Sequence, residues 1–206
     1  MHKVAMFVED QAHYEFLKAL LQRLGNNNGT PLDLQWRNAR HGHGKVIREL
    51  QQYIRDLGRD RQALPDLVVV AIDANCKGLN KRTKEVREIT DRIGIHVICA
   101  IPDPHIERWL LLDSSAFKTV FGRGCTAPDR KCERGRYKKQ LCDNIVEAGI
   151  FPNLGGIEYA DEIVQAMDLE RAAQADHSLA RLLSDLRSVF HKWRRSAGDP
   201  PTPVAE

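Results

Sequence analysis

The chain has 206 residues, of which 42% are hydrophobic and 29% charged, and its net charge is +3. This composition is typical of a folded globular protein, so we expect disorder only in the proline-rich end, residues 196–206. No run approaches the roughly 20 apolar residues of a membrane-spanning helix. The apolar run near the start, VAMFV, is too short for a secretory signal. We therefore expect a cytoplasmic protein.

The five cysteines are consistent with that compartment. Cys76 and Cys99 lie in or beside apolar strand-like runs, which predicts ordinary buried thiols. An odd number of cysteines in an intracellular chain argues against a disulfide framework. Cys125, Cys132 and Cys142 lie in one basic segment without a CxxC pair. A zinc site built from these three and a histidine stays open as a less favoured alternative.

The first half of the chain alternates strand-like and helix-like segments. The expected elements, in chain order, are a strand at 3–8, a helix at 12–24, a strand at 32–36, a helix at 45–57, a strand at 67–72, a helix at 80–93 and a strand at 95–101. Residues 67–72 (LVVVAI) are continuously apolar, which is typical of a strand covered on both faces. The alternation predicts an α/β fold with a mostly parallel four-stranded sheet flanked by helices.

After residue 104 the pattern becomes helical. The segments 105–121, 137–148, 158–167 and 179–193 carry apolar residues at helical spacing, and Trp109 on a leucine-rich stripe is expected in the core. We expect a helical C-terminal extension. The predicted division is an α/β catalytic domain at 1–122, a basic helical extension at 123–195 and a disordered tail at 196–206.

Acidic and amide side chains follow three of the predicted strands. They are, in chain order, Glu9, Asp10, Glu15, Asp73, Asn75, Asp103 and Glu107. In open α/β sheets the carboxyl ends of the strands form the ligand-binding edge, so we expect these residues to converge there. Oxygen ligands favour Mg²⁺, with Mn²⁺ as a substitute, and such an ion beside a phosphodiester promotes hydrolysis.

Each of these residues alone is more often structural than functional; Asp73, for example, could simply cap the next helix. Their combination favours a metal site. We expect the carboxylates of Glu9 and Asp73 to lie within about 8 Å of each other. Asn75 and at least one of Glu15 or Glu107 should border the same pocket.

Positive charge is concentrated in residues 123–139 (RGCTAPDRKCERGRYKK) and 191–195 (HKWRR). Such clusters suit a polyphosphate partner, although a solvated basic loop explains them about equally well. The expected nucleic-acid contacts are Arg130, Lys131, Arg134, Arg136, Lys138 and Lys139. His41 and His43, in an HGHG turn, are expected to be an exposed loop rather than a metal site.

Glu9 in FVED and Asp73-x-Asn75 in VVVAIDAN resemble the Toprim fold, which has a glutamate after its first strand and a D-x-D after a later one. The resemblance covers roughly residues 3–112. The chain is most similar to RloB-like and OLD-type Toprim proteins associated with phage defence. Further matches are the Glu9-Asp10-x4-Glu15 opening, PHIERWLLL at 104–112 and Tyr137-Lys138-Lys139. The resemblance implies a nuclease and an SMC/ABC-type ATPase partner.

The resemblance also implies roles for individual residues. Glu9 would act as general acid/base or as a metal ligand through water, and Asp73 would be the principal magnesium ligand, with Asn75 auxiliary. Glu15 and Glu107 would complete the outer part of the site. Lys138 would neutralise charge on the scissile phosphate, with Lys139 or Lys77 as substitutes.

Two positions depart from the Toprim pattern. Asp10 replaces the usual glycine, and Asn75 replaces the second aspartate of D-x-D. The site could therefore use a single metal, need a partner to complete it, or be inactive. The leading hypothesis is a magnesium-dependent nuclease acting on DNA or RNA, and a nucleotidyl or phosphoryl transferase is a second enzymatic reading. The non-enzymatic alternative is a nucleic-acid-binding or regulatory subunit of an ATPase complex.

Overall fold

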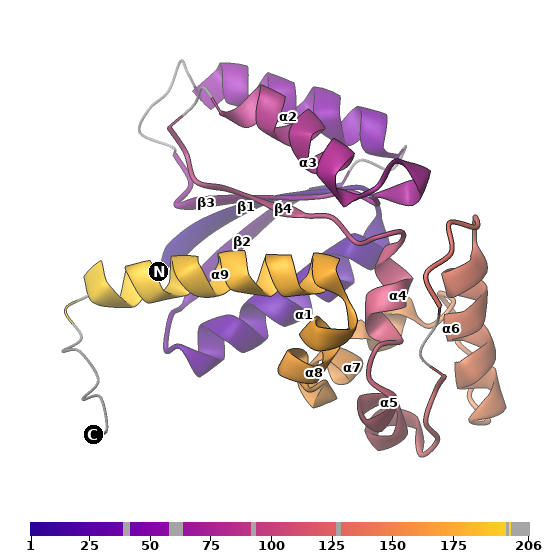
Figure 1. The fold of residues 1–206 in the computed structure, drawn as a ribbon. Coiled ribbons are helices and arrows are strands. Elements are labelled where there is room, and N and C mark those ends of the chain that lie inside the picture. Colours follow the sequence, from indigo (N-terminus) through magenta and orange to yellow (C-terminus); the bar gives the residue numbers. More distant parts are fainter. Residues whose placement is uncertain (39–41, 58–63, 92–93, 127–128, 197, 199–206) are drawn as a thin grey trace.

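The structure, a computed structural model, describes residues 1–38, 42–57, 64–91, 94–126, 129–196 and 198. Its centre is a four-stranded sheet in the order β2-β1-β3-β4, with every neighbouring pair parallel (Figure 1). The strands are β1 (His2–Val8), β2 (Leu32–Asn38), β3 (Leu67–Ala71) and β4 (Val97–Ala100). All five residues of β3 are buried, and β3 lies between β1 and β4. The predicted α/β fold is confirmed.

Helices cover both faces of the sheet (Figure 1). The helices of this sandwich are α1 (Gln11–Asn27), α2 (His43–Leu57), α3 (Leu79–Thr90) and α9 (His177–Ser196). On one face, Phe7 and Val70 share a core with Leu50 of α2 and Val86 of α3. On the other face, α1 and α9 pack in a larger cluster with the alternate strand residues, such as Val69. The period-two alternation of a strand explains why successive residues enter different cores.

Smaller elements follow β3 and β4 in the chain. They are η2 (Asn75–Lys77), α4 (Ile106–Leu110), α5 (Ser114–Phe121), α6 (Arg136–Glu147), η3 (Ile157–Tyr159), α7 (Ala160–Ala166) and α8 (Leu169–Ala175). The helix expected over 105–121 is two helices instead. Asp113 breaks it, because its carboxylate accepts the backbone N–H groups of Ser115 and Ala116 and so starts a new helix.

One core cluster joins the two halves of the chain. It contains side chains as far apart in sequence as Val4 and Phe190. Trp109 is fully buried in it, as expected, and its Nε1–H lies 3.2 Å from Asp176 Oδ1 and 3.1 Å from Ser178 Oγ. Residues 199–206 of the expected tail lie outside the described residues. None of the described helices is both long enough and apolar enough to cross a membrane.

Candidate metal centre

Glu9 and Asp73 meet at the carboxyl ends of β1 and β3. Oε2 of Glu9 accepts the backbone N–H of Asp73 at 2.9 Å, and its Oε1 accepts the backbone N–H of His43 at 3.1 Å. Gly42 has a φ of +77°, a conformation open to glycine, and it turns the chain so that His43 faces Glu9. The Glu9 carboxylate is therefore fixed by two backbone donors.

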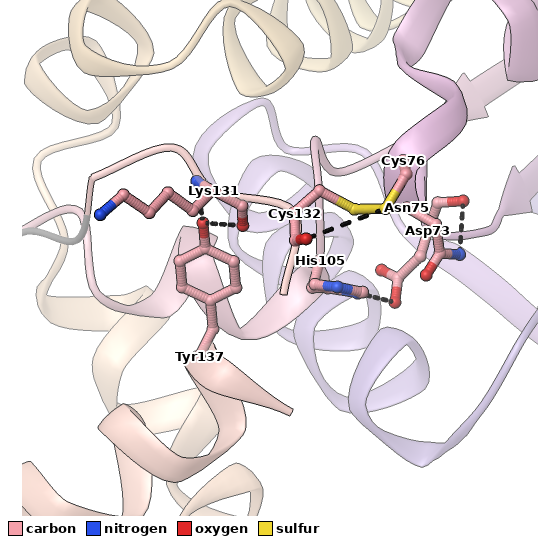
Figure 2. Close-up of a disulfide and its surroundings, with 7 residues drawn as sticks. All are labelled: Asp73, Asn75, Cys76, His105, Lys131, Cys132 and Tyr137. Carbon is pink, nitrogen blue, oxygen red and sulfur yellow. Dashed lines mark hydrogen bonds and ion pairs between the residues drawn. A yellow bond between two sulfur atoms is a disulfide. The ribbon is translucent and has the colours of Figure 1, made fainter. Parts of the chain in front are cut away.

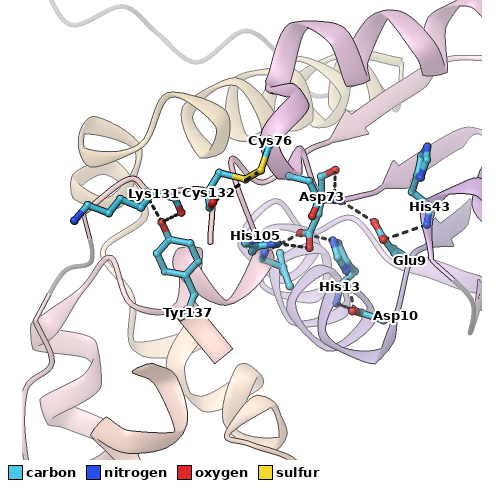
Figure 3. Close-up of polar contacts among 12 residues, drawn as sticks. Glu9, Asp10, His13, His43, Asp73, Cys76, His105, Lys131, Cys132 and Tyr137 are labelled. Atoms are coloured by element: carbon cyan, nitrogen blue, oxygen red, sulfur yellow. Dashed lines mark hydrogen bonds and ion pairs between the residues drawn. A yellow bond between two sulfur atoms is a disulfide. The ribbon is translucent and has the colours of Figure 1, made fainter. Parts of the chain in front are cut away.

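His13 of α1 completes a three-residue cluster with these carboxylates (Figure 3). Each of Glu9, His13 and Asp73 offers one ligand atom, and these atoms all lie within 4.8 Å of one another. The expected proximity of Glu9 and Asp73, within about 8 Å, is thus met. Two carboxylates and an imidazole are a donor set that divalent metals accept.

The His13 ring is completely buried between two carboxylates. Its Nδ1 lies 2.8 Å from Asp10 Oδ1 and its Nε2 lies 3.1 Å from Asp73 Oδ1. The second contact is within ion-pair distance but is not aligned as a hydrogen bond. Nε2 consequently has no hydrogen-bond partner among the described residues.

His105 approaches Asp73 from the other side. Its Nδ1 lies 2.9 Å from Asp73 Oδ2, and the backbone N–H of Ile106 donates to Asp73 Oδ1 at 3.0 Å. The segment that contains His105 and opens α4 therefore fixes the orientation of the carboxylate. The sequence analysis assigned no role to His105.

The two histidines control the charge of the cluster. Burial alone would raise the pKa of Asp73, but the charge of His13 and the hydrogen bond from His105 outweigh it and lower that pKa. Burial would lower the pKa of His13, yet Asp73 and Asp10 hold it well above the ordinary value. The hydrogen bond to Asp73 likewise raises the pKa of His105. Asp73 is therefore ionised, and imidazoles balance its charge.

Glu107 lies at the edge of this charge cluster. Burial, together with the charges of Asp73 and Asp10, raises its pKa. It lines a pocket of about 470 Å³ with Asp10 and Lys138. The described structure thus brings Glu107 and Lys138, two of the predicted site residues, to one pocket that adjoins the Glu9–Asp73 centre.

Three other acidic or amide residues behave differently from the expectation. Asn75 turns back on its own loop, where its Nδ2 donates to the backbone oxygen of Asp73 at 3.4 Å. Glu15 accepts a hydrogen bond from Gln11 and is not a member of the metal cluster. Asp103 pairs with Arg130 and lines a separate pocket of about 500 Å³. The acidic residues are therefore divided, because Asp103 follows β4, one strand farther from β1.

Local acids neutralise much of the predicted nucleic-acid-binding segment. The ion pairs are Arg130–Asp103, Lys131–Asp129, Arg136–Asp129, Arg136–Glu133 and Lys139–Asp143. Among the described residues, no carboxylate pairs with Arg134 or Lys138. Tyr137 anchors the segment, since its Oη accepts the backbone N–H of Lys131 at 2.7 Å (Figure 2).

A disulfide between Cys76 and Cys132 joins this basic segment to the loop after Asp73 (Figure 2). Its Cα atoms are 5.4 Å apart, and the two cysteines are separated by 56 positions. The expectations of a buried Cys76 thiol and of no disulfide are wrong, because the fold brings two exposed loops together over that long separation. The zinc alternative also fails, since Cys132 is bonded and the buried Cys125 lies 3.6 Å from the carbonyl oxygen of Leu111.

Sequence reasoning missed both histidines of the centre. His13 occupies a buried position on the apolar side of α1, where helical spacing alone indicates core. Its position four residues after Glu9, just past the acidic end of the first strand, was the sequence feature that could have indicated a role in the site. Of the two turn histidines, His41 lies outside the described residues. His43 instead opens α2, and its Nε2 lies 3.1 Å from Glu85 Oε1.

Comparison with known protein families gives a match over most of the chain. A family model described as "Domain of unknown function (DUF4276)" matches residues 8–187, a span that contains Glu9, Asp73 and Lys138. No curated protein and no solved structure matches the chain.

Proposed function

The chain belongs to the DUF4276 family, and from its site we propose that it is a divalent-metal-dependent nuclease of the Toprim type that cuts DNA or RNA. The single observation that carries the proposal is the position of Glu9 and Asp73 at the ends of neighbouring parallel strands, with their ligand atoms and that of His13 within 4.8 Å. That edge is where open α/β sheets bind ligands. The Toprim-like order of these residues gives the reaction class.

The two carboxylates supply oxygen ligands of the kind that Mg²⁺ and Mn²⁺ accept, and the buried His13 Nε2, which lacks a hydrogen-bond partner among the described residues, adds a nitrogen donor. When bound, such an ion supplies positive charge to phosphoryl oxygens. Glu9, Asp73 and His13 would hold it. The backbone donors of Asp73 and His43 keep the Glu9 carboxylate oriented for this task or for proton transfer.

Lys138 supports the substrate side of the proposal. It lines the pocket next to the metal centre, and no described carboxylate pairs with it. Its side chain packs along the loop at Gly155, where an added Cβ would lie 3.4 Å from Cε. An ammonium group placed there would attract a phosphate that enters the pocket and would stabilise charge on it during cleavage.

The surroundings of Asp73 favour a second, non-catalytic function. The charge of Asp73 is already balanced by His13 and His105, and Asn75 stands where a second aspartate would be. These features suit a catalytically weak nucleic-acid-binding or regulatory subunit of an SMC/ABC-type ATPase complex. In both cases we propose a role in phage defence, as the resemblance implies, and a cytoplasmic location, as expected from the short apolar run at the start of the sequence.

Incubating the purified chain with plasmid, single-stranded DNA and RNA, in Mg²⁺ or Mn²⁺, tests the proposal. We expect cleavage that chelation abolishes and that Asp73→Asn reduces by orders of magnitude. The matched control is Asp161→Asn, an exposed carboxylate in the first turn of α7. Binding of the same substrates without any metal-dependent cleavage would overturn the nuclease and favour the regulatory subunit.

A further inference from the structure

The metal centre contains one nitrogen donor that the carboxylate pattern of the sequence did not indicate. His13 forms a cluster with Glu9 and Asp73, and the ligand atoms of these three residues all lie within 4.8 Å of one another. The side chain is 0% exposed and belongs to α1, a helix of 17 residues packed on the sheet. Its position is therefore set by the core and not by a mobile loop.

The two nitrogens of this ring have different surroundings. Nδ1 lies 2.8 Å from Asp10 Oδ1, a contact with hydrogen-bond geometry. Nε2 is buried and has no aligned acceptor in the described part of the chain, although Asp73 Oδ1 is 3.1 Å away. When Nδ1–H donates to Asp10, Nε2 points toward the carboxylates of Glu9 and Asp73, and a cation bound there would take the place of the Nε2 proton. Histidines that bind metals in proteins have this arrangement, with a carboxylate on the nitrogen opposite the metal.

We propose that His13 Nε2 is a direct ligand, together with Glu9 and Asp73, of a first-row transition ion, so that the centre binds Mn²⁺ in preference to Mg²⁺. The inference rests on the proposed function for the presence of a metal and adds the identity of that metal. Mg²⁺ prefers an all-oxygen octahedral shell, whereas imidazole nitrogen raises affinity for transition ions. A centre with one buried imidazole therefore discriminates against Mg²⁺.

The competing interpretation makes His13 a structural imidazolium held between Asp10 and Asp73. An imidazolium has an N–H on both nitrogens, so it would need an aligned acceptor at Nε2 as well as at Nδ1. Among the described residues Asp10 Oδ1 is such an acceptor at Nδ1, whereas Asp73 Oδ1 lies 3.1 Å from Nε2 without hydrogen-bond alignment, so a cation in place of the Nε2 proton satisfies that nitrogen better. The ligand interpretation leaves neither nitrogen unpartnered.

Electron paramagnetic resonance of Mn²⁺ added to the full chain separates these interpretations. Pulsed measurements detect the coupling between Mn²⁺ and a directly bound ¹⁴N nucleus. We expect this coupling in the wild-type chain and in His105→Gln, which removes the other imidazole beside Asp73. We expect it to be lost in His13→Gln, together with a roughly 10- to 100-fold weaker Mn²⁺ affinity. Mg²⁺ affinity, measured by competition, should change much less.

Absence of ¹⁴N coupling in the wild-type chain, or an unchanged Mn²⁺/Mg²⁺ affinity ratio in His13→Gln, would overturn the inference. If His13→Gln does not fold, the wild-type spectrum alone decides. The cleavage assay keeps the two proposals apart: coupling without cleavage contradicts the nuclease and supports the ligand role of His13. Failure of Mn²⁺ to bind contradicts the ligand role of His13, and it contradicts the nuclease as well when no Mg²⁺-dependent cleavage is seen.

Discussion

Oε2 of Glu9 accepts the backbone N–H of Asp73 at 2.9 Å, so the residue that follows β1 holds the loop that follows β3. Oε1 of the same carboxylate accepts the N–H of His43 at the start of α2. Glu9 therefore has two roles. It is a candidate metal ligand, and it joins three segments that are distant in the sequence.

Glu9→Gln should affect both roles. Glutamine keeps one acceptor oxygen but presents an NH₂ group to the second backbone N–H, which leaves that donor without a partner. We expect a loss of about 1–3 kcal/mol in the free energy of unfolding, and loss of metal-dependent cleavage. Urea unfolding and the cleavage assay measure the two effects. Glu88→Gln is the control and should change neither, because this exposed residue pairs with Lys84 alone among the described residues. Equal effects in both variants would contradict the assigned roles.

Lys138 and its neighbour Lys139 offer a matched test of the substrate side. Both are exposed on α6, but Lys139 pairs with Asp143, whereas Lys138 lines the pocket beside the candidate metal centre. Lys138→Ala should weaken nucleic-acid binding and lower the slope of log K against log salt by about 0.7–0.9, the value for one lost phosphate contact. Lys139→Ala should leave the slope nearly unchanged. Fluorescence anisotropy at several salt concentrations measures both, and identical slopes would remove Lys138 from the substrate site.

The Cys76–Cys132 disulfide should stabilise the fold. It closes a loop of 56 positions, for which chain entropy gives about 4 kcal/mol. Cys76→Ser should lower the free energy of unfolding by up to that amount, and a reductant should destabilise the wild-type chain but not the variant. Cys142→Ser, at a free cysteine, is the control. Equal stability of the wild-type chain with and without reductant would show that this bond contributes nothing.

Asp113, which lies outside the candidate metal centre, should make the stability of the fold depend on pH. It is buried, and although burial opposes ionisation, the backbone N–H of Asp168 and the guanidinium of Arg171 lower its pKa below the ordinary value. A pKa lowered by folding means that ionised Asp113 stabilises the fold above the unfolded pKa of about 4. This contribution to stability is lost as the pH falls through the lower pKa that Asp113 has in the folded state.

Asp113→Asn removes this contribution. We expect the variant to be about 1–3 kcal/mol less stable than the wild-type chain at pH 7, because a charge-assisted interaction is lost. The difference between the two proteins should shrink as the pH falls below about 4. Urea unfolding at pH 7, 5 and 3 checks the sign, and a difference that grows toward low pH would refute the assignment.

The sequence predicted the structure best where consecutive residues are all buried. The apolar run at 67–72 predicted a strand covered on both faces, and β3 is that strand. Because parallel strands end at a common edge, the proximity of Glu9 and Asp73 followed from the order of elements alone. Local patterns were less informative at Asp113, where a capping side chain interrupts a helical run of apolar residues.

The chemistry of the centre was harder to predict for a physical reason. A histidine at a buried helical position, such as His13, has the same spacing as a core residue, and only its neighbours in space make it a candidate ligand. His105 and the Cys76–Cys132 pair are likewise defined by contacts over 32 and 56 positions. The spacing of residues within one helix or strand gives no information about contacts between residues so far apart in the sequence.

Anomalous diffraction from crystals grown with Mn²⁺ tests the central claim most directly, namely that the carboxyl ends of β1 and β3 hold a divalent cation. We predict one peak among Glu9, His13 and Asp73, within about 2.0–2.5 Å of a ligand atom of each. The peak should be absent from crystals of Asp73→Asn grown in the same way. Wild-type crystals in which Mn²⁺ binds elsewhere on the chain, with no density among these three side chains, would contradict the account.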